Sequence, residues 1–307
     1  MQKNGQLSTL LSFFLLVGLV GIALVLVASA AQAPSETSLT TQSFKFTAID
    51  FPGGSRTRTN GLNDFGDLVG DYFDSAGVRH GYLLSQGKFT TFDPPGSIET
   101  RGLAINNLRV IGGTFLDSNA VRRSFLLKDG VFTIFDFPSA TATFLQGLND
   151  LGQVVGAYND SGGNMHGFLM SEGQFTTIDF PGAVQGTVAG AINDLGQVVG
   201  NYGDASGDAH GFLLSGGKFT TIDFPGALST TSPSGINVWG EVVGFYDDSN
   251  GVLHGLSLIA GKFHALDFPA SSGTFAFRVN DRGEIVGQYF SSGSHGFLAT
   301  PSLRQNP

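Results

Sequence analysis

Apolar residues in this chain occur in short consecutive runs, separated by turns rich in Gly, Asn and Asp. The pieces VVG at 198–200 and GFLL at 211–214 are typical. A strand with one wet face would alternate apolar and polar residues, whereas consecutive apolar residues are expected where both faces of a strand are covered. The pattern therefore predicts short β-strands in a sheet that is packed on both sides.

The same pieces recur at a nearly constant interval. Blocks similar to FTTIDFPG begin at 46, 89, 132, 175, 219 and 263, so successive starts differ by 43, 43, 43, 44 and 44 residues. Each unit contains four strand-like pieces, which we name A (ending in Gly-Leu/Ile-Asn), B (QVVGxY), C (HGFLL) and D (FTTIDFP). Four short antiparallel strands in a unit of this length are typical of a β-propeller blade. The sequence predicts an all-β, six-bladed β-propeller with four strands per blade.

The two ends of the repeat region indicate how the ring closes. The first piece, at 46–52, is a D strand without a preceding A, B or C, and the last, at 295–299, is a C strand without a following D. We expect the N-terminal strand to complete the last blade, which would cover both sheet edges. The propeller is predicted over 43–300, with a C-terminal tail at 301–307.

The first 42 residues differ in composition from the repeats. Lys3 precedes an apolar run at 10–27, which the small residues ASAAQA at 28–33 follow. This order is typical of a secretory signal peptide, assigned here to 1–33, and 34–42 reads as a linker. The alternative is an uncleaved membrane anchor, because the apolar run approaches the length that spans a bilayer. Both interpretations predict that the repeats are exported, to the periplasm, the cell surface or the medium.

The motifs resemble a known repeat family. NDLGQVVG occurs at 149–156 and at 193–200, and HGF follows at 166 and at 210. These motifs resemble the HAF-type extracellular repeat of bacteria, with Gly in place of the Ala in H-A-F, over residues 46 to 300. The resemblance implies export and a bladed β fold, and it implies no common reaction.

Charge and cysteine content exclude several function classes. The formal net charge is −9, which argues against a nucleic-acid partner because such partners are held by Lys and Arg. The chain has no Cys, so disulfides, thiolate catalysis and Cys-ligated metals are excluded. We expect a monomer with no cofactor and no bound metal.

The repeated polar residues are interpreted as scaffold. Five histidines share one position at the start of strand C, too far from the axis to converge on a metal, and we expect hydrogen bonds between blades. One Asp per blade, in IDFP, is expected to cap a turn or to pair with a backbone N–H. Asp and Asn in the B–C loops suggest either calcium binding or ordinary hairpin turns, and their spacing favours turns. These residues are His80, His166, His210, His254 and His295, and Asp50, Asp93, Asp136, Asp179, Asp223 and Asp267.

Ligand-binding residues are expected where the repeat pattern breaks. The D–A loops vary most, and they share a face with the B–C loops. Basic residues and one carboxylate in or just after the D–A loops suggest contact with an anion or a sugar acid. The candidates are Arg56, Arg58, Glu99, Arg101 and Arg278. The single Trp of the chain, Trp239, lies in an N-D-x-G turn on the opposite face, where a local packing role is expected.

These observations predict an exported, non-catalytic β-propeller that binds carbohydrate or a surface protein through its D–A loops. One alternative is a polysaccharide-active enzyme, a lyase or hydrolase with Glu99 and Arg101 at the channel mouth. No second carboxylate accompanies Glu99 in the D–A loops, and G-x-S-x-G is absent, so no catalytic residue is assigned. Another alternative is a structural surface protein without a specific ligand.

Overall fold

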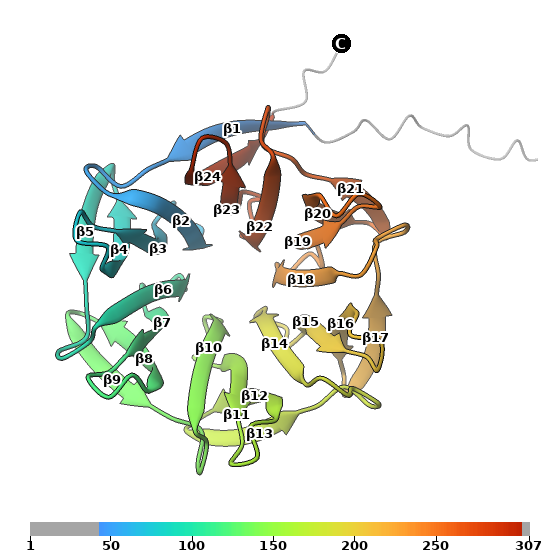
Figure 1. Ribbon diagram of the computed structural model, residues 1–307, viewed down its shortest axis with the longest axis horizontal. Coiled ribbons are helices and arrows are strands. Elements are labelled where there is room, and N and C mark those ends of the chain that lie inside the picture. The colour runs from blue at the N-terminus through green and yellow to red at the C-terminus, as the bar shows by residue number, and fades with distance from the viewer. Residues whose placement is uncertain (1–42, 303–307) are drawn as a thin grey trace, which may run out of the picture. The chain divides into compact units, whose positions relative to one another are not determined.

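The computed structural model describes residues 43–302. They form six four-stranded antiparallel sheets arranged as blades around a central axis (Figure 1). Blade 1 consists of β2 (Ser55–Leu62), β3 (Leu68–Phe73), β4 (Arg79–Ser85) and β5 (Lys88–Phe92), from the axis outward. This is the six-bladed propeller with four strands per blade that the repeat predicts.

The other blades repeat this order. Blade 2 is β6 (Glu99–Ile105), β7 (Ile111–Leu116), β8 (Arg122–Lys128) and β9 (Val131–Phe135), and blade 3 is β10 (Ala142–Leu148), β11 (Val154–Asn159), β12 (Met165–Ser171) and β13 (Gln174–Ile178). Blade 4 is β14 (Thr187–Ile192), β15 (Val198–Gly203), β16 (Ala209–Ser215) and β17 (Lys218–Ile222). Blade 5 is β18 (Thr231–Ile236), β19 (Val242–Asp247), β20 (Leu253–Ile259) and β21 (Lys262–Ala265), and blade 6 is β22 (Gly273–Val279), β23 (Ile285–Phe290) and β24 (Ser294–Pro301) together with β1 (Phe44–Ile49).

The ring closes through the N-terminal strand, as the sequence predicts. β1 pairs antiparallel with β24, from Phe44 opposite Pro301 to Ile49 opposite Gly296. The predicted signal peptide and linker lie outside the described residues. Within 43–302 every regular element is a strand, so this part of the chain contains no helix that could cross a membrane.

Aromatic residues fill the space between blades. The Phe of each IDFP piece stacks on the strand-B Tyr of the next blade, as Phe51 does on Tyr72 with ring centroids 3.6 Å apart. Five of the six junctions carry this pair, and each pair stabilises the fold by about 0.5–1.5 kcal/mol beyond its burial. At the junction of blades 1 and 2 the positions hold Pro94 and Phe115 instead. This junction therefore departs most from the repeat.

The glycine that ends each VVG piece is required by close packing. A Cβ at Gly70 would lie 1.8 Å from the carbonyl oxygen of Arg58 and 2.7 Å from the Tyr82 ring. A backbone and a large ring therefore both lie too close to this position for any side chain.

The N-D-x-G turns join neighbouring blades at the axis. In blade 1, the Asn63 Oδ1 accepts hydrogen bonds from the N–H groups of Phe65 and Asp67, and Gly66 adopts a φ of +80°. The Asn63 Nδ2 donates to the carbonyl oxygen of Asn106, the equivalent residue of blade 2, at 3.2 Å. The same bond recurs at every junction and forms a ring of six, made by Asn63, Asn106, Asn149, Asn193, Asn237 and Asn280.

Candidate functional site

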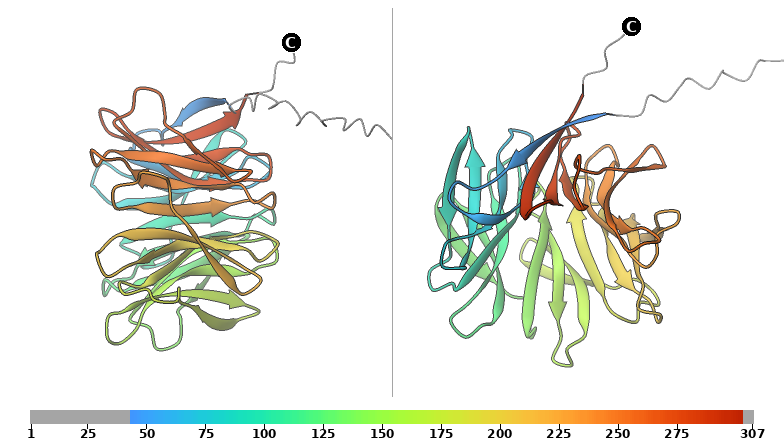
Figure 2. Two further views of the ribbon diagram at one scale, coloured as in Figure 1. Left: turned by 90° about the vertical axis from the view of Figure 1, so that its right-hand side faces the viewer. Right: turned by 45° about the horizontal axis from the view of Figure 1, so that its top comes forward.

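The loops gather on two opposite faces of the ring (Figure 2). The D–A and B–C loops lie on one, here called the D–A face. The A–B and C–D turns lie on the other, the A–B face. The D–A face carries a group of arginines that breaks the repeat pattern. On the A–B face, repeated residues from all six blades line a pocket.

On the D–A face, arginines gather at the junction of blades 1 and 2. They occupy two repeat positions: Arg58 and Arg101 share one on strand A, and Arg79 and Arg122 begin strand C. The other four blades have uncharged residues at both positions, namely Phe144, Val188, Ser232 and Phe275, and Met165, Ala209, Leu253 and Ser294. At these two positions positive charge is therefore confined to one junction, and we call this group the arginine cluster (Arg58, Arg79, Arg101, Arg122, with Asp71 and Glu99).

Glu99 lies at the centre of the arginine cluster. Its Oε1 accepts hydrogen bonds from Arg79 at 3.0 Å and Arg122 at 2.9 Å, and the Arg101 Nε lies 3.4 Å away. Burial raises the pKa of Glu99, but the hydrogen bond from Arg122 and the charges of Arg79, Arg122 and Arg101 outweigh it and lower the pKa below its usual value. A carboxylate held ionised in this way is a poor general acid at neutral pH.

The second carboxylate of the cluster, Asp71, is fully buried. Its Oδ2 accepts a hydrogen bond from the Asn60 side chain at 2.7 Å, and its Oδ1 lies 3.4 Å from the Arg79 Nε. Burial raises the pKa of Asp71, and the neighbouring Arg58 and Arg79 oppose this rise only in part. Because Asp71 is inaccessible, it influences a ligand through its charge alone.

The cluster retains unused donors. Within residues 43–302, the Nε atoms of Arg58, Arg79 and Arg101 are buried and make no hydrogen bond. Those of Arg79 and Arg101 lie 3.4 Å from a carboxylate oxygen, without hydrogen-bond geometry. Buried donors without partners are unfavourable, and four guanidinium groups here face two carboxylates. The arrangement suits a carboxylate, sulfate or phosphate group, which guanidinium binds with paired hydrogen bonds.

The structure brings together three of the five candidate residues: Arg58, Glu99 and Arg101. Arg56 lies at the edge of the cluster, where its guanidinium and that of Arg79 both lie over the Phe73 ring, at 5.3 and 4.5 Å. Sequence reasoning missed Arg79 and Arg122. The signal for them was that units 1 and 2 alone have Arg immediately before the His-Gly position.

The fifth candidate, Arg278, lies apart from the cluster, in the axial channel. Its repeat position holds Gly or Ala in the other blades. The guanidinium donates to carbonyl oxygens of four successive blades. Burial lowers the pKa of Arg278 to about 10, so the side chain remains charged at neutral pH. The carbonyl groups belong to Gln146, Gly190, Ser234 and Phe277.

The A–B face has an acidic pocket at the axis, which the sequence reasoning did not identify. It has a volume of about 90 Å³, and every blade lines it with the Asn of its turn motif, the residue after that Asn and the apolar residue before it. The second residue of N-D-x-G is acidic in four blades, whereas Asn107 and Val238 replace it in the other two. These acidic residues are Asp64, Asp150, Asp194 and Asp281.

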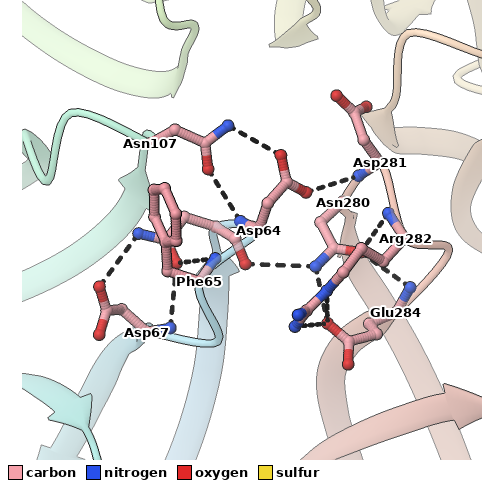
Figure 3. A network of polar contacts seen from close by, with 9 residues as sticks. Asp64, Phe65, Asp67, Asn107, Asn280, Asp281, Arg282 and Glu284 are labelled. Atoms are coloured by element: carbon pink, nitrogen blue, oxygen red, sulfur yellow. Dashed lines mark hydrogen bonds and ion pairs between the residues drawn. The ribbon is translucent and has the colours of Figure 1, made fainter.

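Hydrogen bonds fix these side chains around the pocket, and Figure 3 shows the bonds that join Asn107 and Asp281 to Asp64. The Asp281 N–H donates to Asp64 at 3.0 Å, and the Asn107 side chain donates to Asp64 at 2.8 Å and Asp150 at 2.9 Å. Burial and the neighbouring carboxylates raise the pKa of Asp194 and of Asp281. Within 43–302, no group of three or more acidic or His residues is arranged to hold a metal ion.

The repeated His and Asp pair with each other, which corrects one expectation and only part of another. The His80 Nδ1 lies 2.8 Å from the Asp93 Oδ2 in the same blade, so the bond is not between blades and the partner of this Asp is a His side chain. In blade 5, Asp267 also accepts the expected bond from a backbone N–H, that of Gly255 at 3.3 Å. Blade 2 has Arg123 in the His position, bonded to Asp136. The other pairs are His166–Asp179, His210–Asp223, His254–Asp267 and His295–Asp50.

Two further expectations concern turns. In the B–C loop of blade 1, the Asp74 Oδ1 accepts hydrogen bonds from the N–H groups of Ala76 and Val78, as in ordinary turn chemistry. The packing role expected of Trp239 is wrong. Its side chain is 75% exposed, and its Nε1 donates to the carbonyl oxygen of Asp281 at 3.0 Å.

Comparison with known proteins supports the fold. No protein-family model matches the chain, and a search of curated proteins found no match. Among solved structures, TolB from Acinetobacter baumannii has a TM-score of 0.56 at 13% identity, over 77% of this chain and 64% of that one. A mutant of Aleuria aurantia lectin in complex with alpha-methyl-L-fucoside has a TM-score of 0.52 at 13% identity, covering 84% and 95%. AofleA from Arthrobotrys oligospora has a TM-score of 0.50 at 13% identity, covering 87% and 95%. At these identities the similarity shows a shared propeller fold.

Proposed function

We propose that this protein is an exported, non-catalytic propeller that binds an acidic carbohydrate through the arginine cluster on its D–A face. The observation that carries the proposal is the placement of four arginines at two repeat positions of adjacent blades, with buried Nε donors unused. A uronate or sulfate group would supply negative charge, and acceptors for those guanidinium N–H groups that face solvent, as on Arg101, whose side chain is 34% exposed. A structurally similar lectin was solved with a bound fucoside. That example supports a sugar ligand for this fold, while the charge here favours an acidic one.

Export remains part of the proposal and rests on the N-terminal sequence and on the resemblance to extracellular repeats. The enzyme alternative needs Glu99 as a proton donor or acceptor. The contacts of Glu99 with Arg79 and Arg122 argue against both roles. They keep Glu99 ionised, so that it has no proton to donate, and they lower its pKa, which makes the carboxylate a weaker base.

The test is calorimetric titration of the purified protein with galacturonate oligosaccharides, sulfated oligosaccharides, neutral glucose oligosaccharides and alpha-methyl-L-fucoside. We expect binding to an acidic series alone, weakened by salt and reduced at least about tenfold in the double variant Arg58→Gln/Arg101→Gln. Arg109→Gln is the matched control, because Arg109 lies in the A–B turn of blade 2, on the opposite face.

Equal affinity for neutral and acidic sugars, or unchanged affinity in the double variant, would contradict the proposal. Release of shortened products from a polysaccharide would support the enzyme alternative instead. Binding to a surface protein but to none of these sugars would show that the D–A face recognises a protein.

A further inference from the structure

The A–B face exposes large apolar side chains at one repeat position. The third residue of the N-D-x-G turn is apolar in five blades and is Arg282 in the sixth. Scattered exposed apolar residues are ordinary, but five at one repeat position on one face form a repeated feature that solubility does not favour. We call it the apolar ring: Phe65, Leu108, Leu151, Leu195 and Trp239, with exposed fractions of 68%, 58%, 69%, 68% and 75%.

The turns that carry the apolar ring are rigidly connected. The ring of Asn side-chain hydrogen bonds links each turn to the next, and Trp239 adds a bond to the Asp281 carbonyl of blade 6. A surface that is already ordered loses little conformational entropy when a partner binds.

Inside the apolar ring lies the acidic pocket. Each of its four Asp residues accepts a main-chain N–H from a neighbouring blade, which occupies one oxygen. Within 43–302, the Oδ2 atoms of Asp194 and Asp281 make no hydrogen bond, and these residues flank Val238, whose side chain has no acceptor. Burial, and then repulsion from neighbouring carboxylates, raise the pKa values of both residues, and a cation in the pocket would relieve that repulsion. The volume admits several water molecules, and thus an ammonium or guanidinium group.

We infer that the A–B face is a docking surface for a protein segment that inserts a Lys or Arg side chain into the acidic pocket and lays apolar side chains on the apolar ring. Charge complementarity identifies the partner, because carboxylates at the centre repel anionic lipid and attract a cationic side chain. The surrounding apolar groups exclude water from that contact, as in interface hot spots. The inference is independent of sugar binding on the opposite face.

Trp239 makes the inference directly testable, because it is the only Trp in the chain. A random peptide library without Trp is displayed on phage and selected on the purified protein, and selected peptides are then titrated while Trp fluorescence is followed. We expect peptides with a Lys or Arg flanked by apolar residues, and a blue shift of emission on binding. Replacing that Lys or Arg by Gln, or making Asp194→Asn/Asp281→Asn, should weaken binding at least about tenfold.

Matched variants distinguish specific binding at the A–B face from nonspecific adsorption of peptides to exposed apolar residues. Leu195→Ser should weaken peptide binding, whereas Val184→Ser, at a similarly exposed apolar residue in a D–A loop, should leave it unchanged. Asp194→Asn keeps the oxygen that accepts the Asp150 N–H, so the fold should persist, as circular dichroism can check.

Several outcomes would overturn the inference. These are the absence of selected peptides, selected peptides without a basic residue, and affinities that the Asp variants do not change. A blue shift with phosphatidylcholine vesicles would assign the apolar ring to membranes, and self-association abolished by Leu195→Ser would assign it to a second copy of the chain.

Discussion

The Asn280 side chain donates a hydrogen bond to the carbonyl oxygen of Asn63 at 3.2 Å, across 217 positions of sequence. This bond joins the last blade to the first at the axis. At the rim, β1 completes the last blade by pairing with β24. The ring is therefore closed at two radii by unrelated interactions, and the inner closure positions the acidic pocket.

Asn280→Ala should destabilise the protein by about 2–3 kcal/mol. The substitution removes the bond to Asn63 and a 2.8 Å bond to Glu284, and it leaves the N–H groups of Arg282 and Glu284 without their acceptor. Urea unfolding measures the change. Arg282→Ala, at an exposed residue of the same turn, is the control and should change the free energy of unfolding by less than about 0.5 kcal/mol. Equal losses in the two variants would show that the Asn ring does not stabilise the fold.

The His–Asp pairs predict a pH-dependent stability. The hydrogen bond from His166 to Asp179 raises the pKa of His166. Asp160, held at a pKa of about 2 by its bond from Asn164, adds to this effect. The resulting stabilisation is complete below the unfolded pKa of about 6.5 and is lost as the pH rises through the folded value. His166→Gln should therefore cost more at about pH 6 than at about pH 9, by about 1 kcal/mol or less.

Blade 2 contains the matched control for this prediction. Arg123 takes the place of His and contacts Asp117 at 2.9 Å and Asp136 at 2.6 Å. Because Arg stays charged over this pH range, Arg123→Gln should cost the same at both pH values. A loss for His166→Gln that does not vary with pH would contradict a charged His–Asp pair.

The fold was predictable because several independent features of the repeat require the same architecture. Period, turn residues and the unmatched strands at the two ends all require six closed blades. The partners of repeated side chains were less predictable. That His80 meets Asp93 follows only from the register of β4 against β5, which the sequence pattern leaves open.

The sites were only partly predictable. The pattern break at Arg56, Arg58, Glu99 and Arg101 indicated the junction of blades 1 and 2, where the arginine cluster lies. Arg278 was grouped with them because it follows a D–A loop, but strand A carries it into the channel. The acidic pocket was missed because a single Asp in each N-D-x-G turn is explained by the turn itself and does not indicate a shared site. Convergence of these residues becomes evident only when the A–B turn is known to lie at the axis.

Glu99→Gln distinguishes a binding site from a catalytic one. The substitution removes a negative charge from the arginine cluster while it preserves an acceptor oxygen. If the cluster binds an acidic sugar, affinity should rise roughly three- to tenfold, since less charge opposes the ligand. Titration with galacturonate oligosaccharides measures this, with Glu172→Gln in the exposed C–D turn of blade 3 as control. A fall in affinity, or the loss of a measured hydrolytic or lyase activity, would assign Glu99 a direct role.

Arg278→Ala should lower the free energy of unfolding by about 1–2 kcal/mol and leave sugar affinity unchanged. The guanidinium bonds to main-chain carbonyl groups and to no carboxylate, so its removal leaves no unpaired charge. Breaking a buried ion pair would cost about 3–5 kcal/mol, because the remaining charge loses its partner. Here water in the channel can reach the freed carbonyl oxygens, and Ala already occupies this position in blades 2 and 4. Urea unfolding and titration of one preparation check both parts. A loss above about 3 kcal/mol would show that the channel cannot hydrate these groups, and altered sugar affinity would couple Arg278 to the D–A face.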